Sequence, residues 1–425
     1  MALPLLPAAA QAAGQAGVTA ASATAGSSIA AALGPIGLGV SLLSAGISYF
    51  SQRKAKKKAK KAARAALGEL LNFDGTNNFI PVVYGKRRVE GTLVYISTND
   101  APGGDPNEFL YLVYALCEGE VHQILLADIL VDDLPVTDPR FNYTDSIAIN
   151  IFPGLDNQAA DSRLINETAD WTSDHKLSGI AYISVRLKWD RKAFNNIPVV
   201  SALVYGKKVF DPRTSTTAYS TNPALCIRDY LTNTRYGKGL DVSLIDDASI
   251  IAAADFYDTT VTFWTGGSTG KVFEFNAIVD TEQSILDNLK DMMLCCRGFM
   301  PYTNGIYQLI PDKSSSSVFA FTTNNIIGGI SIQGENKADK YNRMVCTFTD
   351  PANNWQENTV IWPEAGSAEE IAYLAEDNGT ELIGEIELPY ITNFYAARDL
   401  ARVFLLRSRN AIRTSFNANS DALNV

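Results

Sequence analysis

The pattern of apolar and polar positions along the chain predicts an N-terminal arm followed by a β-rich body. Residues 1–52 carry no charged side chain, and residues 28–50 form an apolar run long enough to cross a bilayer as a helix. A strongly basic run follows at residues 53–64. From about residue 79 the pattern changes to short apolar runs separated by polar turns, which is typical of strands.

Strands are predicted in four stretches of the body, at residues 79–98, 107–136, 179–190 and 199–211. Gly119 is expected at the bend within the second stretch. Gly206 is expected at a turn or bulge that divides the fourth stretch into a strand pair. Alternation in the third stretch places Tyr182 on one face and Ile183 on the other. The Asn- and Asp-rich residues 138–178 read as an inserted lobe with short elements.

Helix signals cluster in the second half of the chain. Asn222 followed by Pro223 predicts the start of a helix, because a capping side chain followed by proline suits the first helical turn. Gly237 and Gly239 are available to end that helix. Gly298 is expected to stop a later one. The further helices are predicted at residues 246–257, 280–296 and 393–409.

A hairpin and more strands complete the body. Asn304-Gly305 between two β-prone runs predicts a type I′ hairpin turn, because both residues tolerate a positive φ. Further strands are predicted near residues 328–334, 341–349, 359–362 and 412–419. No strand-helix-strand alternation suggests a doubly wound sheet. The fold class is therefore α+β, mostly antiparallel β, with a helical cluster and an apolar-basic helical arm.

Four segments follow from these patterns: the arm at 1–68, a first β segment at 69–137, lobes with the helical cluster and hairpin at 138–325, and a returning β-domain with a long helix at 326–425.

Composition and charge narrow the class of protein. With 46% hydrophobic and 19% charged residues, the 425-residue chain is neither a disordered tail nor a coiled-coil rod. The net charge is −10, but eight of the 36 basic residues lie in the basic run, so elsewhere 28 basic residues face 46 acidic ones. An acidic body disfavours general binding to nucleic acid.

Candidate chemistry is sparse. The five cysteines are too few and too scattered for a disulfide framework and read as core residues of a protein made in a reducing cytosol. The two histidines form no local metal motif.

Gly266–Lys271 resembles a phosphate loop, but its spacing and flanking strands favour a hairpin turn. Acid pairs at Asp132-Asp133 and Asp246-Asp247 fit a turn or a helix start better than catalysis. No catalytic, metal or cofactor residue is therefore predicted, and the profile suits an assembly component better than an enzyme.

The arm has two interpretations. In the first, residues 28–50 span a membrane, Gly37, Ser41 and Ala45 form a small-residue helix contact, and the basic run lies at the headgroups. In the second, a helical hairpin broken at Gly34-Pro35 packs in an assembly, and the glycines favour this one. The basic run consists of Arg53, Lys54, Lys56, Lys57, Lys58, Lys60, Lys61 and Arg64.

An ordered series of blocks in the body resembles the tail tip or central tail hub proteins of long-tailed bacteriophages, the family that includes the host-specificity protein of lambda-like tails. The blocks begin with IPVVYGKRRVEG at 80–91 and include LVYALCEGEVHQI at 112–124 and NPALCIRDYLTNTRYGKGL at 222–240. The resemblance covers roughly residues 80–425. The family-motif residues, to which it assigns structural roles, are Pro81, Tyr84, Gly85, Gly119, Pro223, Arg235, Tyr236, Gly237, Asn304 and Gly305.

The resemblance implies a homotrimer at the distal end of the virion tail, made in the host cytoplasm, whose tube-like β-domains, from about 80–130 and 326–425, surround the lumen. It implies docking to distal tail and tape-measure proteins and to other tip proteins and fibres. It also implies gating of DNA ejection, with DNA present only in transit, and no cofactor.

Two departures limit the resemblance. The arm at 1–68 lies outside the shared core, so an inner plug in the lumen and insertion into the host membrane both stay open. Relatives continue beyond the last strand, so residue 425 is expected to be the limit of a fragment or an ordered region. The alternatives to a hub are a membrane-anchored bacterial surface protein and a tail-associated wall hydrolase.

Overall fold

The computed structural model describes residues 79–100, 107–141, 146–188, 197–263, 268–317, 319–334, 340–410 and 412–420. The predictions made for the arm, including Gly37, Ser41, Ala45 and the basic run, lie outside these residues. Within them, no helix is long and apolar enough to cross a membrane.

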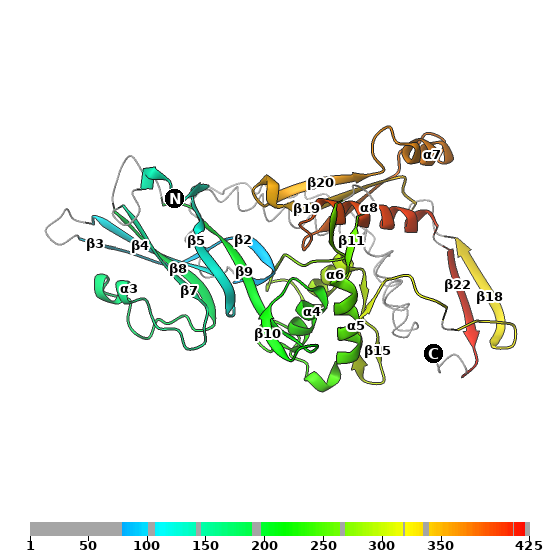
Figure 1. The fold of residues 1–425 in the computed structure, drawn as a ribbon, viewed down its shortest axis with the longest axis horizontal. Helices are drawn as coiled ribbons and strands as arrows, with labels where there is room; N and C mark the ends of the chain where they lie inside the picture. The colour runs from blue at the N-terminus through cyan, green and yellow to red at the C-terminus, as the bar shows by residue number, and fades with distance from the viewer. Residues whose placement is uncertain are drawn as a thin grey trace, which may run out of the picture.

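Two antiparallel sheets form a sandwich lobe, at the left of Figure 1. Their shared core contains Leu112 and Ile183 from the first sheet and Ile129 and Val204 from the second. The first sheet has the order β3 (Thr92–Asn99), β4 (Phe109–Glu118), β8 (Ile180–Lys188), β7 (Ile147–Pro153). The second has the order β10 (Thr216–Tyr219), β9 (Val200–Asp211), β5 (Val121–Val131), β6 (Leu134–Pro135), and β2 (Lys86–Glu90) also pairs with β9.

The alternation expected in β8 is confirmed, and both of its faces are buried. Ile183 faces the core between the sheets, whereas Tyr182 packs on the outer face in a second cluster with Leu164 and Trp171. This outer cluster is covered by α3 (Ser162–Glu167), which follows the short helix η2 (Pro139–Phe141) and strand β7. Residues 138–178 thus include a strand of the first sheet as well as short elements.

Two details of the sandwich differ from expectation. Gly206 does not divide two strands: β9 runs unbroken through it, and the missing side chain instead lets the Val83 carbonyl approach. Gly119 does sit at a bend, with φ +82°, but β4 and β5 on either side of it belong to different sheets and do not pair with each other.

A helical lobe follows, in the centre of Figure 1. Its helices are α4 (Pro223–Thr232), α5 (Asp247–Tyr257) and α6 (Ile285–Cys296), with the short helix η3 (Val242–Leu244). Its strand pairs are β1 (Val82–Tyr84) with β13 (Ala277–Val279), β11 (Thr260–Thr262) with β12 (Thr269–Lys271), β14 (Gly298–Phe299) with β17 (Ile310–Pro311), and β15 (Tyr302–Thr303) with β16 (Ile306–Tyr307).

Local signals predicted much of this lobe. Asn222 caps α4 by accepting from the Ala224 N–H, and Pro223 stands in its first turn. Asn304 and Gly305 have φ +54° and +86° in the β15–β16 turn, as a type I′ hairpin requires. Helix α6, however, begins at Ile285, later than expected, because Ser284 caps it. Its left-handed end residue is Arg297, at φ +51°, and Gly298 already lies in β14.

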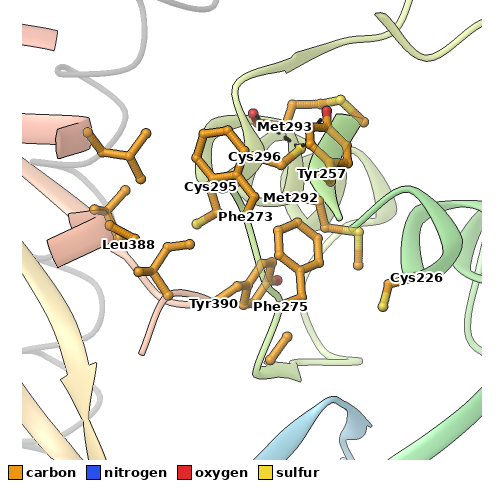
Figure 2. Close-up of a cluster of buried hydrophobic side chains, with 14 of the residues drawn as sticks. Cys226, Tyr257, Phe273, Phe275, Met292, Met293, Cys295, Cys296, Leu388 and Tyr390 are labelled. Atoms are coloured by element: carbon orange, nitrogen blue, oxygen red, sulfur yellow. Dashed lines mark hydrogen bonds between the residues drawn. The ribbon is translucent and has the colours of Figure 1, made fainter. Parts of the chain in front are cut away.

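All five cysteines are buried and none forms a disulfide bond, as the core interpretation expected. Cys226, Cys295 and Cys296 lie with Met292 and Met293 in a sulfur-rich core of the helical lobe (Figure 2). Burial raises the pKa of the Cys296 thiol to about 12, which disfavours the reactive thiolate.

The C-terminal lobe is a three-stranded sheet with the order β20 (Gln356–Trp362), β19 (Arg343–Asp350), β21 (Ile383–Leu388). The predicted long helix, α8 (Phe394–Arg409), packs on it, and β19 and β21 run parallel. The short helix η5 (Pro351–Asn353) follows β19, and α7 (Ala368–Glu376) was not predicted. Beyond this lobe, β18 (Ile326–Gly334) and β22 (Ile412–Ala418) form a two-stranded ribbon at the right of Figure 1.

A charge cluster around Asp377 fixes the end of α7 against the end of α8. Asp377 accepts hydrogen bonds from Arg409 at 2.7 Å, Lys340 at 2.5 Å and Asn342 at 3.1 Å. Burial alone would raise the pKa of Asp377, but these hydrogen bonds outweigh it and lower the pKa to about 2. The ionised carboxylate is therefore favoured in the folded protein.

We predict that Asp377→Asn destabilises the protein by roughly 1–3 kcal/mol at pH 7, because charged hydrogen bonds are lost. The folded pKa lies below the unfolded value of about 3.9, so this contribution is present above pH ~4 and is lost as the pH falls toward 2. Urea unfolding of both proteins between pH 7 and pH 3 measures the difference. Glu381→Gln, at the exposed pair with Arg343, is the control and should change stability by less than about 0.5 kcal/mol. A difference that grows as the pH falls would contradict the prediction.

Candidate functional site

Most of the family-motif residues meet where the sandwich lobe joins the helical lobe; we call this place the junction. Pro81, Tyr84 and Gly85 reach it along β1, and Gly119 reaches it from the bend after β4. Arg235, Tyr236 and Gly237 reach it from the segment after α4. The Glu118 N–H donates to the Pro81 carbonyl at 2.9 Å, which ties β4 of the sandwich to the start of β1 in the helical lobe.

Not every motif residue belongs to the junction. Pro223 is buried at the start of α4, where it shapes the helix. Asn304 and Gly305 form the turn of the exposed β15–β16 hairpin. These three residues act locally, through helix capping and turn geometry.

One carboxylate at the junction accepts hydrogen bonds from two motif tyrosines. Asp229 Oδ2, on α4, lies 2.5 Å from the Tyr84 hydroxyl and 2.7 Å from the Tyr236 hydroxyl, and both hydroxyls donate to it. Burial, reinforced by the nearby Asp229 charge, raises the pKa of both Tyr84 and Tyr236 well above the usual value. The tyrosines therefore stay protonated and serve as donors that hold β1 and the segment after α4 to the same helix.

Two basic side chains, Arg235 and Lys207, also lie at the junction. Arg235 pairs with Glu118 at 2.6 Å, and the Lys207 ammonium lies 5.5 Å from the centre of the Tyr236 ring. Lys207 also comes close to Gly119. Arg235 is half exposed, so its pair contributes little to stability by itself and serves mainly to fix the orientation of the segment.

Backbone contact at the junction requires glycine. Gly85 has φ +65°, and a Cβ there would lie 2.0 Å from the Phe275 carbonyl oxygen. Before it, β1 pairs with β13 of the helical lobe; after it, β2 pairs with β9 of the sandwich. Gly85 is thus the point at which the chain passes from one lobe to the other. Gly237 is equally enclosed, because its Cβ would lie 2.0 Å from the Tyr230 carbonyl oxygen.

Asn276 connects all three lobes and was missed by sequence reasoning. Its Oδ1 accepts from the Lys86 N–H at 2.8 Å, in the sandwich lobe. Its Nδ2 donates to Thr392 Oγ1 at 2.7 Å, and its own N–H donates to the Tyr390 carbonyl at 3.0 Å, in the C-terminal lobe. A single Asn between short apolar runs carries no signal that its partners lie more than 100 positions away.

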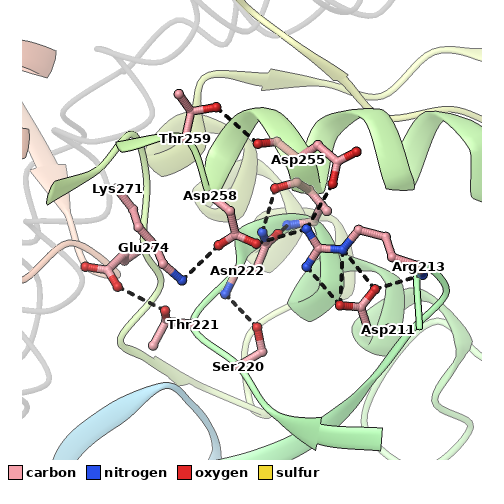
Figure 3. A network of polar contacts seen from close by, with 12 residues as sticks. Asp211, Arg213, Ser220, Thr221, Asn222, Asp255, Asp258, Thr259, Lys271 and Glu274 are labelled. Atoms are coloured by element: carbon pink, nitrogen blue, oxygen red, sulfur yellow. Dashed lines mark hydrogen bonds and ion pairs between the residues drawn. The ribbon is translucent and has the colours of Figure 1, made fainter. Parts of the chain in front are cut away.

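A further charge network joins the end of β9 to the helical lobe (Figure 3). Arg213 pairs with Asp211 at 2.8 Å, Asp255 at 3.1 Å and Asp258 at 3.0 Å, and Asp258 also pairs with Lys271 at 2.8 Å. Lys271 ends β12, which forms an antiparallel hairpin with β11. The hairpin interpretation of the loop-like Gly266–Lys271 stretch is therefore confirmed for its described part.

The two acid pairs also have structural roles. Asp132 and Asp133 lie in a turn, where Asp132 accepts from the Val199 N–H at 2.9 Å. Asp246 caps α5, and Asp247 pairs with Arg228 at 2.7 Å. Among the residues that the structure describes, no group of three or more His, Cys, Asp or Glu side chains could hold a metal ion.

Two curated phage tail proteins are similar in sequence to this chain. The chain is 25% identical over 422 residues to baseplate hub protein pb3 of Escherichia phage T5, covering 82% of this chain and 43% of that protein. It is 27% identical over 187 residues to tip attachment protein J of Escherichia phage SECphi27, covering 42% of this chain and 15% of that protein. The chain thus spans less than half the length of these relatives. No protein-family model matches it.

A solved structure shares the fold. A chain from the virion of a native gene transfer agent particle superposes with a TM-score of 0.52 at 14% identity, over 80% of this chain and 74% of that one. The α+β fold class is confirmed, and so is the resemblance to phage tail tip and hub proteins. The division of the chain into four segments stays a prediction.

We predict that Gly85→Ala destabilises the protein by more than about 3 kcal/mol, because a methyl group would collide with a backbone carbonyl that cannot move cheaply. Gly366→Ala is the matched control: Gly366 also has a positive φ, +78°, but faces open space. It should lose only about 1–2 kcal/mol through backbone strain. Urea unfolding measures both; equal losses would show that the junction is not tightly packed.

We also predict that the two tyrosines are energetically coupled through Asp229. Tyr84→Phe and Tyr236→Phe should each lose roughly 1–3 kcal/mol, since each removes a hydrogen bond to a charged group. The double variant should deviate from the sum of the single variants by at least about 0.5 kcal/mol, as expected for residues that share a partner. A double-mutant cycle by chemical unfolding tests this. Additivity within about 0.3 kcal/mol would contradict a shared acceptor.

Proposed function

We propose that this chain forms the hub of a phage tail tip, at the distal end of the virion tail, as a homotrimer that closes the end of the tail tube. The observation that carries this proposal is the sequence match to a baseplate hub protein over 82% of the chain. The match to a tip attachment protein and the shared fold of a virion chain support it.

In this role the hub is a gate and an adaptor. One face docks the distal tail protein, the lumen meets the end of the tape-measure protein, and the outer end carries receptor-binding parts and fibres. Opening releases the tape measure and the DNA. The excess of acidic over basic residues in the body suits a conduit for DNA, because like charge keeps phosphates off the wall.

The junction gives this role a mechanical basis. A hub must transmit force between its tube-docking and receptor-bearing ends without its lobes separating. The Gly85 crossing and Asn276 each tie one lobe to another, and Asp229 with its two tyrosines fixes β1, the strand that leads into the crossing, to α4. We infer that these groups support assembly and catalyse no reaction, in line with the structural names of both relatives.

The role of the arm is a separate proposal. Three copies of about residues 28–65 meet near the axis, with the apolar faces together and the basic run near the tape measure or the DNA. Insertion of the same segment into the host membrane during ejection is the alternative.

Electron microscopy of the virion that carries this chain tests the hub assignment. We expect density for the chain at the distal tail end with threefold symmetry, fitted by the sandwich and helical lobes as one unit. Particles from a phage with the Gly85→Ala chain should lack this density and be non-infectious, whereas the Gly366→Ala chain should restore normal tails. Absence of the chain from the tail end of wild-type particles, or density of another symmetry, would refute the proposal.

A further inference from the structure

The β18–β22 ribbon differs from the rest of the protein in how much apolar side chain it exposes. Ile330, Ile332 and Ile412 are 53%, 70% and 71% exposed, although β18 pairs regularly with β22 from Ser331 to Gly334. The ribbon projects at one end of the long axis of the molecule, away from the sandwich lobe (Figure 1). A two-stranded ribbon is marginally stable in water by itself, so an exposed isoleucine cluster calls for a partner.

The isoleucines lie on one face. Cross-strand neighbours share a face, and Ile332 pairs with Thr414 while Gly334 pairs with Ile412, two positions along. Ile330 precedes this paired stretch, where the register of β18 against β22 shifts. The opposite face carries polar residues, since Ser331 pairs with Ser415 and Gln333 follows two positions later. The sequence has therefore kept the pattern of a half-buried sheet, although no other described part of the chain covers the apolar face.

The base of the ribbon is fixed by aromatic contacts. The Phe321 ring lies 4.9 Å from the Phe416 ring and 4.9 Å from the Phe319 ring. The Asn419 N–H donates to the Asn325 carbonyl at 2.9 Å, which closes this end of the ribbon. The strands beyond it are thus held in a defined register and present a fixed surface.

Both outer edges of the ribbon are open. In the described part of the chain, β18 and β22 each pair only with the other. Strand β18 has no charged residue and no proline, the side chains with which proteins usually protect an edge. The open edges therefore offer backbone donors and acceptors to a further strand.

We propose that the ribbon docks a second copy of this chain, with β22 of one copy alongside β18 of the next and the isoleucine faces turned toward a common axis. When a second ribbon is added in this order, neighbouring strands stay antiparallel and the isoleucines stay on one side of the combined sheet. The open edge of β22 in one copy is then paired with the open edge of β18 in the next. Such head-to-tail contacts close into rings when the rotation allows. This inference rests on the proposed hub, because it names the contact through which the copies assemble.

Three variants of the full chain test the contact. Ile332→Asp and Ile412→Asp each put a charge on the proposed interface, and Gln333→Asp puts the same charge on the opposite face of the same strand. All three sites are exposed, so the variants should fold like the wild type, which far-UV circular dichroism and thermal unfolding check.

Sedimentation velocity over a range of protein concentrations measures self-association. Hydrogen-deuterium exchange at the same concentrations measures protection of the β18 and β22 amides. We expect the wild type to associate, and its ribbon amides to become more protected as the protein concentration rises. The association constant should fall at least about tenfold for both isoleucine variants and change less than about threefold for Gln333→Asp.

Each other result overturns the inference in a recognisable way. If the wild type associates and the isoleucine variants associate equally well, the trimer stands but uses another surface. Ribbon amides protected in a chain that stays monomeric would mean that a segment of the same chain covers the face. A monomer with unprotected ribbon amides would exclude a second copy as the partner, and the hub assignment would then depend on the virion density alone.

Discussion

The structure depends on one close backbone crossing at the junction of the lobes. The chain passes from the helical lobe to the sandwich at Gly85, where a side chain would lie 2.0 Å from the Phe275 carbonyl, and Gly206 lets β9 approach the Val83 carbonyl from the other side. Val83 belongs to β1, and the peptide that follows Phe275 is fixed by the hydrogen bond from the Asn276 N–H to the Tyr390 carbonyl, so the two carbonyls hold the lobes in one relative position. The shared acceptor Asp229 then binds Tyr84 and Tyr236, which holds β1, the strand that leads into this crossing, to α4.

Sequence reasoning predicted what local chemistry determines. The Asn222-Pro223 start of α4 and the Asn304-Gly305 turn follow from capping and from positive φ, and both are where they were expected. One failure depends on a distant partner: Gly206 serves a neighbouring strand rather than a turn. Two others are local. The Ser367 cap of α7 was not recognised, and α6 ends at Cys296 as predicted, but Arg297 rather than a glycine adopts the left-handed conformation after it.

Several residues of the junction were predicted from the sequence, but their proximity in the fold was not. The resemblance selected Tyr84 and Tyr236 from blocks far apart in sequence, and only the fold shows that they donate to one carboxylate, which for Tyr84 lies 145 positions away. Asp229 and Asn276 were absent from the predicted set because a single polar residue in a helix or between short apolar runs is not distinctive. The described residues therefore include both a tightly packed junction that unites the lobes and a ribbon whose isoleucines are exposed.

The central claim is that the junction unites the sandwich and helical lobes into one cooperative unit. Native-state hydrogen exchange at increasing denaturant tests it most directly. The amides of β1 and β13 should open with the same free energy and denaturant dependence as the cores of β8 and α4, because the lobes can separate only by global unfolding. If the cores of β8 and α4 instead open with different free energies or denaturant dependences, the lobes are independent bodies and the account is wrong.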